Sequence, residues 1–128
     1  MSYSLGKRSQ ENLQGVHNDL VKVVKLAIKE SGQDFTVIDG MRTYAEQRKL
    51  VARGVSRTMN SRHLTGHAVD VIPYPIPRDW NEYRGSQWAE ISRAMKTAAK
   101  QLGVSLEWGG DWKNSWDKPH YQLPRSEY

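Results

Sequence analysis

The sequence predicts an α+β fold in which two or three helices pack on a small antiparallel sheet. Three observations predict it. Two long segments carry apolar residues at helical spacing, and short runs rich in β-branched residues lie outside them. The chain has 128 residues, 38% of them hydrophobic, which is enough to bury one core without disulfides or other staples. We therefore expect a single domain.

The first helical segment runs from Leu13 to Ile28, where seven apolar positions share one helical face. Gly15 and the pair His17-Asn18 are expected to divide it into a short helix and a longer one. The longer helix should end at Ser31-Gly32, because glycine favours helix ends. The four residues 35–38 are apolar or β-branched and predict a buried strand.

The next helix is marked by its start. Thr43 and Glu46 have the spacing of a capping box, so a helix should begin at about Tyr44 and end at Gly54. Residues 55–62 are expected to form a loop. Residues 68–72 then predict a strand, which the proline-rich run that follows would end.

The C-terminal third supplies the other long helix and two more strands. The helix ends at Gly103, and its expected buried face is Trp88, Ile91, Met95, Ala98 and Leu102. Residues 104–108 are one strand candidate. Residues 120–123 are another, after a loop rich in glycine and tryptophan.

Composition restricts the chemistry. The chain has no cysteine, so any metal must be held by imidazole and carboxylate groups.

The net charge of +5 comes from basic residues spread along the chain rather than clustered, so we expect no nucleic-acid partner. No apolar run approaches the roughly 20 residues of a membrane span, so no membrane insertion is expected. The N-terminus shows no apolar signal segment, so synthesis in the cytoplasm is expected.

One short stretch gathers polar side chains just before a strand. SRHLTGHAVDVI places His63, His67 and Asp70 within eight residues. Taken alone, the stretch is a weak motif, because a loop histidine near a strand aspartate is more often a hydrogen-bonded pair than a metal site. Gly66 lies between the two histidines and a strand follows, so a helical pair of zinc ligands is not expected.

A second stretch, LEWGGDWKNSWDKPHYQL, supplies what the first one lacks. His120 adds a third ligand to His63 and Asp70, which matches the three N and O ligands of a catalytic zinc site. Asp117 would then remain beside the metal to accept a proton from water. In the alternative interpretation of this stretch, the side chains of Trp108, Trp112 and Trp116 belong to the core and Asp117 caps a turn.

Three separated motifs, which follow one another along the chain at 40–43, 61–70 and 116–121, resemble those of the LAS-type zinc metallopeptidases. That family includes D-alanyl-D-alanine carboxypeptidases, D-Ala-D-Ala dipeptidases and L-alanyl-D-glutamate endopeptidases. The first motif is Ser-x-His-x-x-Gly-x-Ala-x-Asp at 61–70, and the second is Trp-Asp-Lys-Pro-His-Tyr at 116–121. The third is Gly-Met-Arg-Thr at 40–43, with Gln47. The resemblance covers roughly residues 36–123.

The resemblance implies roles for individual residues. One zinc ion per chain would be bound at the sheet by His63, Asp70 and His120, with Asp117 as general base. Arg42 would stabilise the substrate or the oxyanion. His67 falls on a variable position of the motif and is left out of the ligand set. The candidates for substrate binding are Ser61, Gln47 and Trp112.

The residue at the general-base position indicates the subgroup of the family. An aspartate at position 117, together with the WGGDW run and the compact size, is similar to the L-alanyl-D-glutamate endopeptidases of phage lysis cassettes and wall remodelling. The chain would be a single zinc peptidase domain over 1–128 without a separate wall-binding domain. It would act as a monomer on peptidoglycan stem peptides in the periplasm or cell wall, after release by a holin-like exporter. The alternatives are a D-Ala-D-Ala carboxypeptidase and a non-catalytic, zinc-stabilised binding module.

Overall fold

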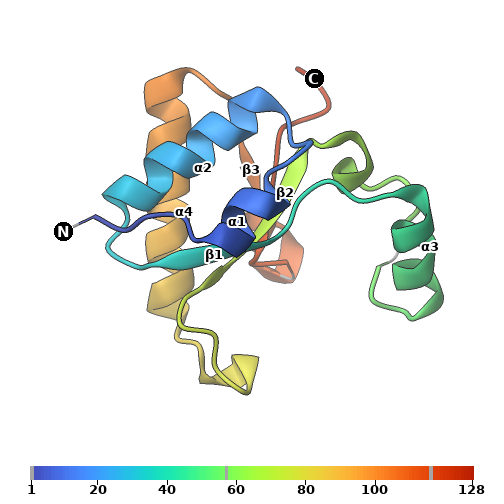
Figure 1. The fold of residues 1–128 in the computed structure, drawn as a ribbon, viewed down its shortest axis with the longest axis horizontal. Coiled ribbons are helices and arrows are strands. Elements are labelled where there is room, and N and C mark those ends of the chain that lie inside the picture. Colours follow the sequence, from blue (N-terminus) through green and yellow to red (C-terminus); the bar gives the residue numbers. More distant parts are fainter. Residues whose placement is uncertain (1, 57, 116) are drawn as a thin grey trace.

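The computed structural model describes residues 2–56, 58–115 and 117–128. Within these residues the strands form a four-stranded antiparallel sheet in the order β1-β2-β4-β3 (Figure 1). The strands are β1 (Phe35–Asp39), β2 (Ala68–Pro73), β3 (Glu107–Trp108) and β4 (His120–Gln122). The main helices are α1 (Lys7–Asn12), α2 (Asn18–Glu30), α3 (Tyr44–Ala52) and α4 (Gly85–Leu102). The α+β class predicted from the sequence is confirmed.

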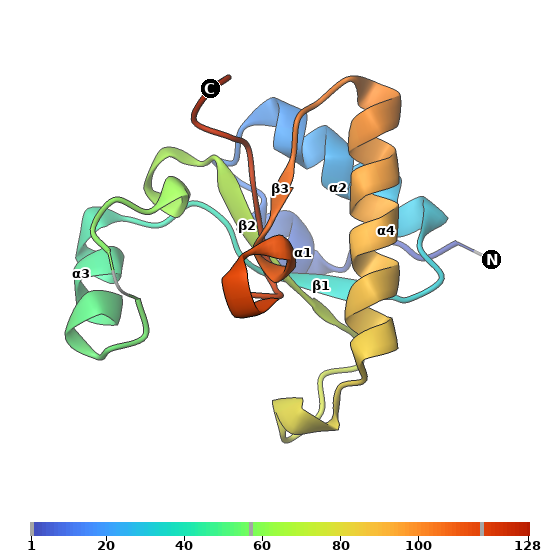
Figure 2. The same cartoon turned by 180° about the vertical axis from the view of Figure 1, so that it is seen from behind.

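The core lies between the sheet and the paired helices α2 and α4, and α3 stands apart from both with the sheet between them (Figures 1 and 2). Strand alternation sorts the side chains. Val69 and Val71 of β2 and Tyr121 of β4 point into the core and are at most 1% exposed. Asp70 lies between the two valines and His120 lies next to Tyr121, so both point to the opposite face of the sheet. This open face carries the polar residues.

The capping box is present as expected. The Thr43 hydroxyl accepts a hydrogen bond from the Glu46 backbone N–H at 3.1 Å, and the Glu46 carboxylate accepts one from the Thr43 N–H at 2.9 Å. These two bonds satisfy donors that the start of a helix otherwise leaves unpaired, so α3 begins at Tyr44. This start fixes the direction in which the chain leaves Arg42.

The first helical segment differs from the prediction. The break falls where expected, but the short helix is α1, which ends at Asn12 before the apolar run begins. Leu13 and Val16 lie in the connection and are still buried. Gly15 turns the chain there with φ of 82°, a conformation that glycine adopts without steric cost. His17 then caps α2 by accepting the backbone N–H of Asp19 on Nδ1, at 3.1 Å.

Two C-terminal expectations also need correction. The strand expected at 104–108 is only Glu107–Trp108, because the Val104 N–H is bonded to the Ala99 carbonyl at the end of α4 and cannot join a ladder. Leu102 was expected on the buried face of α4 but is 41% exposed. It lies in the last turn, just before Gly103 ends the helix with φ of 69°.

Among the described residues no helix is both long and apolar enough to cross a membrane.

Candidate active site

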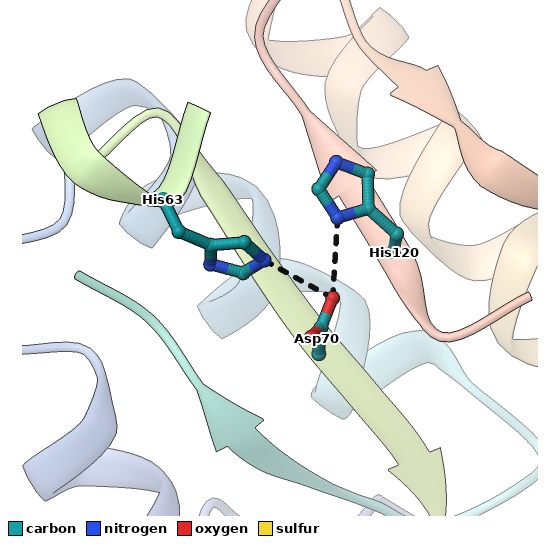
Figure 3. Close-up of side chains that lie close together, drawn as sticks. All are labelled: His63, Asp70 and His120. Atoms are coloured by element: carbon teal, nitrogen blue, oxygen red, sulfur yellow. Dashed lines mark hydrogen bonds and ion pairs between the residues drawn. The ribbon is translucent and has the colours of Figure 1, made fainter. Parts of the chain in front are cut away.

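His63, Asp70 and His120 meet on the open face of the sheet (Figure 3). His63 lies on the short 3₁₀ helix η1 (Arg62–Thr65), which begins when the Ser61 hydroxyl accepts the His63 backbone N–H at 3.2 Å. Gly66 closes that helix with φ of 74° and directs the chain into β2. The register of β2 and β4 then pairs Asp70 with His120. Three separate segments thus bring three side chains together.

Each histidine has one ring nitrogen engaged outside the cluster. The Nδ1 of His63 lies 2.7 Å from the Gly40 carbonyl oxygen, which can only accept, so this nitrogen carries the proton. The Nε2 of His120 lies 2.8 Å from Oε1 of Gln122 and is the donor there. The other nitrogen of each ring is therefore unprotonated in the neutral side chain. Both of these nitrogens point at Oδ1 of Asp70, at 3.3 Å and 3.2 Å.

This arrangement fits a bound cation. Among the described residues, Nε2 of His63 is a buried side-chain nitrogen without a hydrogen-bond partner, although buried polar groups are normally satisfied. Two nitrogen lone pairs and a carboxylate oxygen face one another, which is repulsive unless a positive charge lies between them. A tetrahedral ion with ligand bonds of about 2.0–2.2 Å holds its ligand atoms about 3.3–3.6 Å apart. The two distances to Asp70 are close to that separation.

The pKa shifts also favour positive charge at this point. Burial alone would raise the pKa of Asp70, but the adjacent His120 and His63 rings, which can donate to it and carry charge when protonated, hold its pKa well below its usual range. Burial alone would lower the pKa of His120, but the hydrogen bond and the charge of Asp70 raise it. The cluster therefore keeps an ionised carboxylate and draws a cation to the neighbouring nitrogens. Imidazole and carboxylate ligands suit zinc and related divalent metals.

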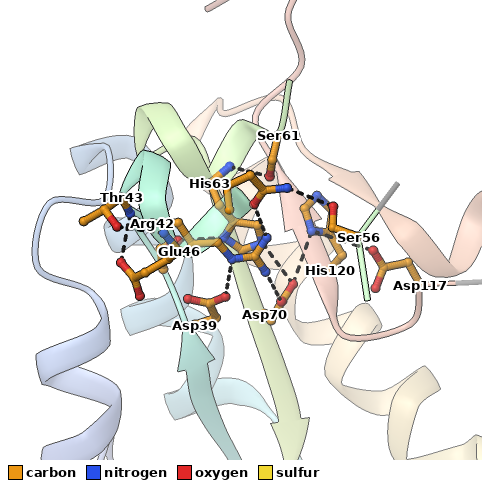
Figure 4. A network of polar contacts seen from close by, with 12 residues as sticks. Asp39, Arg42, Thr43, Glu46, Ser56, Ser61, His63, Asp70, Asp117 and His120 are labelled. Carbon is orange, nitrogen blue, oxygen red and sulfur yellow. Dashed lines mark hydrogen bonds and ion pairs between the residues drawn. The ribbon is translucent and has the colours of Figure 1, made fainter. Parts of the chain in front are cut away.

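Arg42 supports Asp70 from the other side (Figure 4). Its Nε donates to Asp39 at 2.6 Å, one terminal nitrogen donates to Gln47 Oε1 at 2.9 Å, and the other lies 3.4 Å from Oδ2 of Asp70. Its side chain is 13% exposed. A guanidinium held at three points inside a polar network differs from a surface salt bridge, whose side chains are mobile and solvated.

Gln47 lies behind Arg42 rather than in the cleft. It is fully buried, and its Nε2 donates to the Ser56 hydroxyl at 2.8 Å and to the Thr58 carbonyl at 2.6 Å. Its Oε1 accepts from Arg42, so both ends of the amide are used. Gln47 therefore fixes the guanidinium of Arg42 and anchors the loop that follows α3.

A cleft of about 550 Å³ opens beside the cluster and contains two more of the expected residues. Asp117 lies in it with Oδ2 3.9 Å from Nδ1 of His120, and its backbone carbonyl accepts the His120 N–H. Burial raises the pKa of the Asp117 carboxyl, which makes it a better proton acceptor. Trp112 also lines the cleft, with its ring centroid 5.3 Å from that of His120.

The remaining expected residues are placed as follows. Ser61 lines the cleft as well as capping η1. Trp108 stacks on Tyr121 and packs against the core, which agrees for this residue with the alternative interpretation of the tryptophans as core residues. Trp116 lies outside the described residues. His67 contacts Thr65 and the ring of His17 rather than the cluster of His63, Asp70 and His120.

Sequence reasoning missed three groups that hold the site in place. These are the Gly40 carbonyl, the Asp39 carboxylate and the Gln122 amide. Strand alternation was a usable signal for Gln122, since it lies two residues after His120 and so shares its face. The contact of Gly40 with His63 spans 23 positions in the chain and has no sequence pattern.

Comparison with known proteins agrees with this site. The model of the family described as "Phage L-alanyl-D-glutamate peptidase" matches residues 1–123. The L-alanyl-D-glutamate peptidase of Escherichia phage T5 is 37% identical, over all of this chain and 94% of that protein. The peptidase of the same name from Listeria phage A118 is 34% identical, over 78% of this chain and 34% of that protein.

A solved structure is similar along nearly the whole chain. The crystal structure of the L-Ala D-Glu endopeptidase ChiX of Serratia marcescens superposes with a TM-score of 0.86 at 44% sequence identity. The match covers 99% of this chain and 94% of that chain. The similarity therefore includes the sheet and the segments that carry the polar cluster.

Proposed function

Because the chain belongs to the phage L-alanyl-D-glutamate peptidase family, we propose that it cleaves the amide bond between L-Ala and D-Glu in peptidoglycan stem peptides. The observation that carries this proposal is the convergence of two imidazole nitrogens and one carboxylate oxygen beside a cleft. Asp117 in the same cleft supports an enzyme rather than a binding module, since a structural metal site has no use for an additional carboxylate.

The metal in this proposal is zinc, one ion per chain, held by Nε2 of His63, Oδ1 of Asp70 and Nδ1 of His120. Bound there, zinc supplies a Lewis acid that polarises the scissile carbonyl and makes water more acidic. Gly40 and Gln122 keep the two histidines in the tautomers that present a lone pair to the ion. Arg42 keeps the Asp70 carboxylate oriented.

Asp117 is the proton carrier in this proposal. Its carboxylate accepts a proton from the attacking water and returns it to the amine of D-Glu as that group leaves. The raised pKa supports both transfers, because a base works best when its pKa approaches the working pH. Asp117 lines the cleft but is not part of the group of three ligand atoms that lie within 4.8 Å of one another, which supports a role beside the metal rather than as a ligand.

Arg42 is expected to contribute to turnover more than to folding. We expect Arg42→Ala to lower kcat by about 10–100-fold, because Asp70 loses its orienting partner and the developing oxyanion loses a nearby cation. Zinc content at saturating zinc should remain near one per chain. The control is Arg48→Ala, an exposed arginine on α3, which should behave as wild type. An unchanged kcat for Arg42→Ala would show that this residue forms only a structural salt bridge.

The products of digestion test which bond is cleaved. Purified peptidoglycan treated with the protein should yield fragments with a new D-Glu (or D-isoglutamine) amino terminus, identified by mass spectrometry, with terminal D-Ala retained. Free D-Ala as the main product would instead indicate a D-Ala-D-Ala carboxypeptidase. Heat-inactivated protein and a chelator-treated sample are the controls.

The setting of the reaction is part of the same proposal. Catalysis and substrate binding share one cleft, and the protein acts as a monomer in the periplasm or cell wall. A holin-like exporter gives it access to peptidoglycan. The similarity to a phage peptidase over 94% of that protein's length supports this setting.

A further inference from the structure

Among the described residues, three arginines line the cleft, and two of them have their guanidinium groups fixed within the protein. Arg42 is bonded to Asp39, Gln47 and Asp70. Arg62 is 8% exposed, and its guanidinium donates to the Leu123 carbonyl at 3.3 Å and 3.1 Å. Both guanidinium groups are thus already held by acceptors of the protein itself.

Arg125 is the third arginine, and it differs from both. It is exposed, and its two terminal nitrogens donate to the side-chain oxygen and the backbone carbonyl of Asn60. Both acceptors are neutral. No ion pair formed by the described residues includes Arg125, so its charge is not neutralised within the part of the chain that the structure describes. Its remaining N–H groups can bind a ligand.

The position of Arg125 is fixed relative to the metal cluster. It follows β4, the strand of His120, and Leu123 on the way is bonded to the His67 carbonyl at 2.9 Å. Its partner Asn60 directly precedes Ser61, which caps the helix that carries His63. Both segments that carry the histidine ligands therefore hold Arg125 at the cleft.

This part of the cleft is positively charged. Besides burial, the charge of Arg125 lowers the pKa of Arg62, so the two guanidinium groups lie close enough to repel. In the described part of the chain, the acids that line the cleft are Asp70 and Asp117, and both belong to the proposed catalytic centre. Arg62 also donates to the Tyr128 backbone oxygen and is influenced by the charge of Glu107, whereas the acceptors of Arg125 are both neutral. The uncompensated charge of Arg125 therefore creates a potential that attracts an anionic ligand.

The anionic groups of the substrate all lie on one side of the scissile bond. The L-Ala side continues through a neutral amide toward the sugar. D-Glu continues through its γ-carboxyl group, which leaves its α-carboxylate free next to the amine that leaves. A cation in the cleft therefore interacts with the D-Glu side of the peptide.

We propose that Arg125 binds the free α-carboxylate of D-Glu and makes the enzyme prefer D-Glu over D-isoglutamine, in which this group is a neutral amide. The inference rests on the proposed function. The planar guanidinium matches a carboxylate with paired hydrogen bonds, and an amide offers a single acceptor without charge. Asn60 holds the guanidinium in advance, so little side-chain entropy is lost on binding.

The test uses two synthetic stem peptides that differ only in the D-Glu α-group, carboxylate or carboxamide. Wild-type, zinc-loaded protein should cleave the carboxylate peptide with a kcat/KM about tenfold higher, the size expected for a charged hydrogen bond. Arg125→Gln should lose this preference by slowing only the carboxylate peptide, and Arg125→Lys should keep part of it. Arg8→Gln removes the same charge from the exposed face of α1 and should keep the full preference.

Binding of the released D-Glu-containing fragment, measured by calorimetry, gives a readout independent of catalysis. The carboxylate fragment should bind more tightly than its amide to wild type and equally weakly to Arg125→Gln. Equal losses on both peptides in Arg125→Gln, or no preference in wild type, would overturn the inference. A carboxylate preference in fragment binding without any cleavage would keep it and reject the proposed function.

Discussion

Asp117→Asn should retain zinc and lose hydrolysis. The amide has nearly the shape of the carboxylate and can still hydrogen-bond a water molecule, but it cannot accept a proton. Positioned general bases contribute about 10²–10⁴-fold, so kcat on peptidoglycan should fall by that factor. Zinc should stay near one per chain, because Asp117 Oδ2 lies 3.9 Å from Nδ1 of His120 and outside the three-ligand cluster.

Asp117→Glu is the matched control for this substitution. It keeps the carboxylate but moves it by one methylene group, so partial activity is expected. Zinc content by elemental analysis and turnover by release of new amino termini should be measured on the same samples. Loss of zinc in Asp117→Asn would make this residue a ligand, and near-normal hydrolysis with zinc intact would place the base elsewhere.

Removal of the metal should have the second large effect. Chelation should reduce hydrolysis to background, and added zinc should restore it. The melting temperature should also fall, because a ligand at 100 times its Kd stabilises the folded state by about 2.7 kcal/mol, on the order of 10 °C for a domain of this size. Calorimetry with and without chelator measures the shift.

Comparing His63→Ala with His67→Ala distinguishes the effect of losing a proposed metal ligand from the effect of losing any histidine. His63→Ala removes a ligand, so its activity should be at background and its melting temperature insensitive to chelator. His67 lies outside the cluster, and its variant should bind zinc and respond to chelator as wild type does. A chelator response that persists in His63→Ala would show that the metal binds at other residues.

The cluster of His63, Asp70 and His120 was predictable because its residues lie in short, ordered motifs. His63 and Asp70 are seven positions apart at a turn-to-strand boundary, and His120 begins another β-rich run. Strand alternation then places Asp70 and His120 on one face once the two strands pair. The capping box at Thr43 likewise predicted the start of α3, since both of its bonds are local.

The supporting contacts were not predictable, because they depend on tertiary packing. The Gly40 carbonyl reaches His63 only because the segment before α3 passes beside η1, and the Arg42 N–H is bonded to the His63 carbonyl there. A side chain at Gly40 would overlap the carbonyl of Asn12 in α1, so this close approach requires glycine. Gln47 was expected to contact substrate, but the fold buries it behind Arg42.

The same dependence explains the short strand β3. Residues 104–108 have strand-like composition, but the bonds that close the end of α4 take the Val104 N–H before a ladder begins. Local hydrogen bonds at a helix end thus override strand propensity.

The most direct test of the metal assignment is a crystal structure of the zinc-loaded protein with anomalous data collected at the zinc absorption edge. The proposed site predicts one strong peak per chain, within about 2.0–2.2 Å of Nε2 of His63, Oδ1 of Asp70 and Nδ1 of His120. Asp117 should lie beside the peak without bonding to it. A peak away from this cluster, or one bonded to His120 through Nε2, would contradict the assignment.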